Sequence, residues 1–126
     1  MSQSINLIER TGVAGEDLSA KQYFIVQLDA SGNIEVGEGA TDLLVGVLQN
    51  KPQSGEAALY RFGGTSKVKA GGAVGVGAWV TSDANGKGVA TTTDGDITIG
   101  RHIGTAAAAD GDIMEVQVSI QHLYIA

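Results

Sequence analysis

The sequence predicts an all-β fold, a small barrel-like or sandwich-like domain, and three observations support this. Glycine is abundant, with 19 among 126 residues, and glycines between β-branched residues are typical of tight turns and bulges in a many-stranded fold. Short runs of β-forming residues alternate with turn residues along the whole chain. Only Thr105 to Asp110 has the composition of a helix, and we expect a loop there with at most one helical turn.

The predicted elements follow from alternation and turn chemistry. Residues 1–20 lack sustained periodicity, and we interpret them as an extended N-terminal arm about one strand long, followed by a single β domain at residues 21–126. We expect Gly46 to mark a bulge or a close backbone approach, and Gly63-Gly64 to separate two strands. Strands are predicted at residues 23–28, 34–36, 43–48, 57–62, 65–70, 78–81, 97–103 and 114–120.

The second half of the chain resembles the first. The turn Asp29-Ala-Ser-Gly32 has a counterpart in Asp83-Ala-Asn-Gly86, 54 residues later, and Gly46 has one in Gly100. A further shift of two residues aligns Gly55-Glu56 with Gly111-Asp112. We infer an internal pseudo-repeat of strand, turn, strand, loop, glycine-containing strand, loop and strand; the alternative is coincidence among common turn residues.

Composition excludes several classes of function. The chain has no cysteine, so it has neither disulfides nor thiolate metal sites. Its formal net charge is −6 and its basic residues are scattered, whereas nucleic-acid binding requires clustered positive charge. The N-terminus lacks the basic and apolar regions of a signal peptide, and no apolar run approaches a membrane span of about 20 residues. We therefore expect a soluble chain that is not exported and does not bind nucleic acid or membranes.

The search for metal and catalytic sites finds no constellation. His102 and His122 are the only histidines, and neither has partners at metal-ligand spacing. The sequences Asp94-Gly-Asp96 and Asp110-Gly-Asp112 fit turns that lead into strands, and a weak cation site is the alternative, since neither has the ligand series of an EF-hand.

Two further segments resemble known motifs only superficially. The glycine series at residues 71–77 is not followed by the Lys-Ser/Thr and helix of a phosphate-binding loop, and is interpreted as a turn region. Lys87 lies at a predicted hairpin tip, as in lipoyl and biotinyl carrier domains, but without their flanking residues. We predict no catalytic residue, metal, cofactor or small-molecule substrate, and assign the chain to binding or structure.

The chain resembles the capsid decoration, or cement, proteins of tailed bacteriophages over about residues 12–118. The resemblance rests on short glycine-based motifs that recur in the same order: Val13-Ala-Gly-Glu-Asp-Leu18, Tyr23-Phe-Ile-Val26, Leu44-Val-Gly-Val47, Val68-Lys-Ala-Gly71, Gly77-Ala-Trp-Val80 and Gly111-Asp-Ile-Met-Glu-Val116.

This resemblance implies a compact β-barrel or β-tulip domain that assembles as a homotrimer on the outside of the expanded capsid. It also implies an N-terminal arm that lies on the major capsid protein, and it offers no catalytic residue. The candidate capsid-contact residues are Ile5, Leu7 and Ile8, chosen for their place in the arm and their apolarity. Strand addition by such an arm is a known mode of recognition.

Two other readings stay open at this point. The chain could be a different viral structural β module, such as a tail, fibre or adhesin domain, which would more often carry a coiled coil or a second domain. It could also be an enzyme or carrier domain, which would require a deep pocket with convergent polar groups.

Overall fold

The computed structural model describes residues 7–123, which form nine β-strands and, within that range, no helix. The strands are β1 (Ile8–Val13), β2 (Ile25–Leu28), β3 (Ile34–Val36), β4 (Leu44–Leu48), β5 (Ala57–Lys69), β6 (Trp79–Ser82), β7 (Gly88–Thr91), β8 (Ile97–His102) and β9 (Ile113–His122). They make one curled antiparallel sheet in the order β3-β2-β4-β5-β9-β8-β6-β7, and β1 also pairs with β5. The all-β, barrel-like prediction is confirmed, and the single sheet excludes a two-sheet sandwich.

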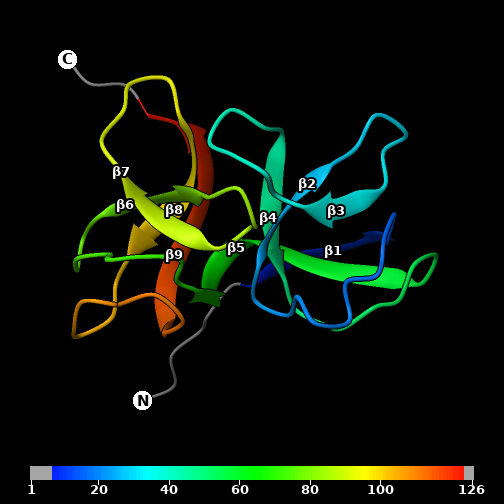
Figure 1. The fold of residues 1–126 in the computed structure, drawn as a ribbon, viewed down its shortest axis with the longest axis horizontal. Coiled ribbons are helices and arrows are strands. Elements are labelled where there is room, and N and C mark those ends of the chain that lie inside the picture. Colours follow the sequence, from blue (N-terminus) through cyan, green and yellow to red (C-terminus); the bar gives the residue numbers. More distant parts are fainter. Residues whose placement is uncertain (1–6, 124–126) are drawn as a thin grey trace.

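The internal repeat predicted from the sequence is visible in the topology. Strands β1 to β4 and the first half of β5 form one lobe, and the second half of β5 with β6 to β9 forms the other (Figure 1). In each lobe the pairings are equivalent: β2 with β3 and β4 corresponds to β6 with β7 and β8, and β4 with β5 corresponds to β8 with β9. We call these lobes the first repeat (residues 8–63) and the second repeat (residues 64–122).

Individual hydrogen bonds repeat with the same offsets as the sequence. The carboxylate of Asp29 accepts the backbone N–H groups of Ser31 and Asn33, and that of Asp83 accepts those of Asn85 and Lys87. Such bonds are the Asx-turn geometry in which Asp substitutes for backbone. Turns of the same kind 54 residues apart show that the sequence match is structural and not a coincidence.

Gly46 and Gly100 occupy equivalent places where two strands approach closely. A Cβ on Gly46 would overlap the carbonyl oxygen of Arg61, and one on Gly100 would overlap that of Gln117. Both glycines therefore permit a backbone approach that a side chain would prevent. This confirms the close approach predicted at Gly46.

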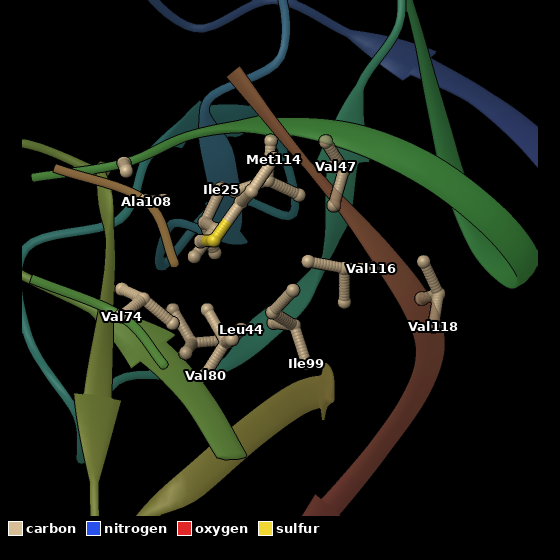
Figure 2. Close-up of a cluster of buried hydrophobic side chains, with 12 residues drawn as sticks. Ile25, Leu44, Val47, Val74, Val80, Ile99, Ala108, Met114, Val116 and Val118 are labelled. Atoms are coloured by element: carbon tan, nitrogen blue, oxygen red, sulfur yellow. The ribbon is translucent and has the colours of Figure 1, made fainter. Parts of the chain in front are cut away.

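Two clusters of buried apolar side chains form the core. One lies within the first repeat and contains Ala14, Leu18, Val26, Ile34, Leu48, Ala58 and Tyr60. The other lies within the second repeat around Val80, Ile99 and Met114, but it also contains Ile25, Leu44 and Val47 of the first repeat (Figure 2). The outer face of β2 and β4 therefore packs into the second lobe, which joins the two repeats.

The expectation that Gly63-Gly64 separates two strands is wrong, because β5 continues through both residues. A Cβ on Gly63 would lie 2.8 Å from the side chain of Ile8, and Gly64 has φ +83°. The two glycines therefore accommodate a close contact and a backbone distortion within one strand. This continuous strand connects the repeats.

The alanine-rich segment at residues 105–110 is a loop, as expected, and contains no helical turn. The backbone of Ala108 exchanges two hydrogen bonds with that of Val74, 2.8 and 2.9 Å long. This bridge fixes Ala108 in a β conformation between bends at residues 105 and 106 and a turn at residue 110, so tertiary pairing overrides the helix propensity of alanine.

The N-terminal segment contributes to the sheet within its described part. Residues 8–13 form β1 along the first half of β5, and Ala14 and Leu18 are buried in the core of the first repeat. The division of the chain into an arm at residues 1–20 and a domain at residues 21–126 stays a prediction.

Candidate functional site

The first candidate site is the edge strand β1 and the residues around it. β1 pairs with β5 on one side, and no described residue supplies a strand to its other side. The row of N–H and C=O groups along an edge strand is available to pair with another chain. An open edge of this kind is the structural requirement for strand addition.

Two interactions hold β1 in place. Glu9 accepts hydrogen bonds from Arg61, at 2.8 Å from Nη2 and 3.0 Å from Nε, and Arg61 also donates to the carbonyl of Thr65. At the start of the strand, Ile8 lies against the bare backbone of Gly63. The ion pair and the glycine contact fix β1 on β5 while its apolar side chains stay at the surface.

The candidate contact residues lie partly within this region. Leu7 is 46% exposed and Ile8 is 49% exposed, whereas Ile5 lies outside the described residues. Val13 and Phe62 are also exposed, and sequence reasoning missed them because their strands were not known to be neighbours. Phe62 precedes Gly63, the partner of Ile8, and its ring lies 6.1 Å from that of Tyr60, between ring centres.

His102 is a buried core residue. Its side chain is 2% exposed, and its Nδ1 accepts the backbone N–H of Gly104 at 3.0 Å. The ring proton is therefore on Nε2, which donates to the carbonyl of Ala106 at 2.9 Å. A cavity of about 510 Å³ adjoins it, lined by residues 102–108 and 112–115. Both nitrogens of His102 are engaged with the backbone, so they serve to fix the loop.

The Asp-Gly-Asp sequences form turns that precede strands, as predicted. Gly95 and Gly111 have φ of +93° and +88°, and β8 and β9 begin directly after the turns. Asp96 accepts the hydroxyl of Thr91 at 2.6 Å, and Asp112 accepts the backbone N–H of Ala109 at 2.9 Å. Across residues 7–123 no group of three or more His, Asp or Glu side chains is placed to hold a metal ion.

Lys87 and the glycine series also have structural roles. Lys87 lies 3.7 Å from Asp110 in an ion pair, and its backbone closes the turn at Asp83. Gly71 donates its N–H to the carbonyl of Gly88, and a Cβ there would overlap the carboxylate of Asp83. The glycine series is therefore a turn region, as predicted.

Several carboxylates gather beside β3. Partial burial, together with the neighbouring charges of Glu16, Asp29, Glu38 and Asp42, raises the pKa of Glu35. The amide of Gln27 donates to both Glu35 and Glu38, at 3.1 and 3.2 Å, and offsets part of this repulsion.

A second carboxyl shift lies at the start of the loop before β2. Hydrogen bonds from the side chain and the backbone N–H of Ser19 lower the pKa of Asp17. This arrangement is a local turn, and the shift follows from hydrogen bonding to the charged form.

Comparisons with known proteins agree with the fold. The structure of "head fiber gp8.5 N base in bacteriophage phi29" is similar, with a TM-score of 0.69 and 17% sequence identity; the match covers 95% of this chain and 100% of that one. At this identity the likeness concerns the fold. A comparison with curated proteins gives no match. Residues 7–123 include no helix with the length and apolarity that a membrane crossing requires.

The family assignment rests on the sequence. The profile of phage cement proteins matches residues 3–120, which is nearly the whole chain. The match extends over both repeats and includes β1 and most of β9. The chain therefore belongs to the phage cement protein family and is a phage structural protein.

Proposed function

We propose that this protein binds the outer surface of the shell formed by the major capsid protein and stabilises the expanded capsid by contacts alone, without catalysis. The observation that supports this most is the family match together with an open β1 edge flanked by exposed apolar residues. Monomeric proteins rarely leave an apolar patch beside an open strand edge unless a partner covers it.

The contact mode follows from the geometry of β1. Main-chain groups on the open edge would pair with a strand of the capsid protein, and Ile5, Leu7 and Ile8 would be buried in the contact. Each apolar side chain removed from water contributes about 1.5–3 kcal/mol. Repeated on many copies around one shell, such contacts would link neighbouring capsid subunits against internal DNA pressure.

The decisive experiment is binding to expanded shells that lack this protein, measured by cosedimentation over a range of concentrations. We expect saturable binding, at least tenfold weaker for Leu7→Asp, because a buried carboxylate in an apolar contact is costly. The matched control is Leu43→Asp, since Leu43 is 60% exposed and lies between β3 and β4, away from β1. Failure of the unaltered protein to bind shells would refute the proposed function. Equal binding by both variants would refute the assignment of Leu7 to the capsid contact.

We also propose that the protein is a homotrimer on the shell. A trimer matches a three-fold position and would bury additional apolar surface, which benefits a chain with only six aromatic residues. Light scattering on the purified protein should give three times 12.8 kDa. If it gives the monomer mass, crosslinking on decorated shells decides: trimeric adducts support the proposal and their absence ends it.

A fibre module is the second candidate, favoured by the fold likeness to the base of a phage head fibre. The two functions differ in whether a further structure projects from the domain once it is bound to the shell. A decoration protein is complete as a compact cap, whereas a fibre base carries a further projecting part. Electron microscopy of decorated shells distinguishes a low cap from a base that anchors a projection.

A further inference from the structure

A groove of about 290 Å³ lies on the outer face of the second repeat. It is lined by Trp79, Gly100, Arg101, Gln117, Ser119 and Gln121, which come from β6, β8 and β9. Trp79 lies opposite Arg101, and Arg101 lies opposite Gln117, so these side chains form one row across three strands. Ser119 and Gln121 follow Gln117 at two-residue spacing and therefore share its face of the sheet.

The aromatic side of this groove is held in place. The guanidinium of Arg101 lies 4.9 Å from the centre of the Trp79 ring, and its Nε donates to the carbonyl of Gly77 at 3.0 Å. Contacts between a cation and an aromatic ring restrict both groups. The half-buried ring is thus presented at the surface in one orientation, beside a row of exposed polar side chains.

Comparison of the repeats shows that packing does not explain these residues. Trp79 and Arg101 correspond to Ile25 and Val47, 54 residues earlier, which are completely buried between the lobes. In the first repeat this face is apolar because the second repeat covers it. In the second repeat the same positions carry an indole and a guanidinium, and no described strand covers this face of the sheet.

We propose that this groove binds a neutral saccharide. Arg101 lies over one face of the Trp79 indole, and the other face would pack against the C–H face of a sugar ring, with the indole N–H as a hydrogen-bond donor. The amides of Gln117 and Gln121 each offer two donors and one acceptor, and Ser119 adds a hydroxyl, which together match adjacent sugar hydroxyls. The groove is slightly below the size range of small-molecule sites, so it fits one or two sugar rings.

The biological role of this groove rests on the proposed function, because it requires many copies on a capsid. Saccharide binding by the purified protein does not depend on that function. A shallow, solvent-exposed groove gives a dissociation constant of about a millimolar. On a shell that displays many copies, such weak contacts to a surface covered with glycans would add through multivalency.

The test uses the chain's own fluorescence, because Trp79 is its only tryptophan. Maltotetraose and chitotetraose serve as probes of glucose and N-acetylglucosamine chemistry. We expect a saturable change in tryptophan emission with at least one probe, and the same dissociation constant by calorimetry. If neither probe gives a saturable change at concentrations ten times the expected constant, the proposal is overturned.

Variants place the binding in the groove. Trp79→Ala should weaken binding by calorimetry at least tenfold, and Gln117→Ala should weaken it severalfold, since Gln117 is exposed and its loss does not affect the core. Gln53→Ala removes the same amide from an exposed loop elsewhere and should bind as the unaltered protein does. Binding that survives both groove variants would contradict the placement.

The same variants separate this proposal from capsid binding. Trp79→Ala and Gln117→Ala should cosediment with expanded shells as the unaltered protein does, because β9 and β8 separate Trp79 from β5, and Gln117 pairs with Thr65, beyond the part of β5 that pairs with β1. Loss of saccharide binding with shell binding intact supports two independent surfaces. Loss of shell binding in folded Gln117→Ala would show that the groove belongs to the capsid contact, which refutes the saccharide site.

Discussion

Val68 lies against the bare backbone of Gly88 in the second repeat. In the equivalent pair of the first repeat, the large residue and the glycine have changed places. There Ile34 occupies the position of Gly88, and Gly12 occupies that of Val68. A Cβ on Gly88 would lie 3.0 Å from Val68, and one on Gly12 would lie 2.8 Å from Ile34. In each repeat one large side chain therefore fills the space beside a glycine, as close-packed interiors require. The large residue comes from β3 in the first repeat and from β5 in the second.

This exchange predicts the effect of adding a methyl group at Gly88. The new Cβ would also lie 2.7 Å from Met114 and 2.9 Å from Val80, so Gly88→Ala should reduce the free energy of unfolding by about 1–3 kcal/mol. The double variant Gly88→Ala with Val68→Ala should lose less than the sum of the single effects, because shortening Val68 removes one of the three close contacts of the new methyl group. Urea denaturation measures all three. Gly39→Ala is the control, since nothing lies within 4 Å of that Cβ; strict additivity would show that the pair does not share space.

The two aspartate turns should differ in their contribution to stability. The turn at Asp83 packs against the first repeat, where the carbonyl of Gly86 accepts the N–H of Ile25 at 2.7 Å, whereas the turn at Asp29 leaves Gly32 with open space around it. Asp29→Ala should cost about 1 kcal/mol and Asp83→Ala about twice that, because the second also loosens the contact between repeats. Thermal denaturation measures both, and Asp→Asn at each position should recover part of the loss. Equal losses would mean that the lobes do not depend on this turn.

His102 should stabilise the loop at residues 103–108. His102→Leu matches Leu48, its counterpart in the first repeat, but leaves the N–H of Gly104 and the carbonyl of Ala106 without their partner. We expect a loss of about 1–2 kcal/mol, with faster amide hydrogen exchange in the loop. His102→Gln, which retains a donor and an acceptor, should be intermediate. Unchanged exchange in the loop would contradict the role assigned to the imidazole.

Glu35 should make the fold slightly less stable as pH rises. Its pKa is raised in the folded protein, by burial first and then by neighbouring carboxylates, so the folded state holds the proton more tightly than the unfolded state. The resulting destabilisation is absent at pH values below 4.5, the ordinary pKa of a glutamate. It is complete at pH values above the raised pKa of Glu35. Glu35→Gln should therefore raise the stability at neutral pH by about 0.5 kcal/mol or less. The gain should shrink below pH 4.5 and in high salt; a gain independent of both would exclude a charge effect.

Much of the local structure could be predicted because it depends on neighbours in the chain. The turns at Asp29 and Asp83 follow from side chains that bond their own backbone, and the strand at residues 34–36 has the predicted bounds. The strand predicted at residues 23–28 begins at Ile25 instead, because Tyr23 has φ +70° and donates its N–H to Leu48. The offset of 54 residues between the repeats could also be predicted from the sequence, because the turns at Asp29 and Asp83 and the glycines Gly46 and Gly100 share it.

The sequence by itself determined the all-β class, the repeat and the family, because alternation, turn residues and ordered motifs are local properties that need no knowledge of distant contacts. Only the tertiary structure decided that β5 continues through Gly63-Gly64, since that depends on Ile8 lying over Gly63. It likewise decided that Ile25 and Val47 are buried while their counterparts Trp79 and Arg101 line a groove. Equivalent strands in the two repeats form the same pairings, but whether a face of the sheet is covered depends on contacts between residues far apart in the sequence. A local sequence pattern does not encode such contacts.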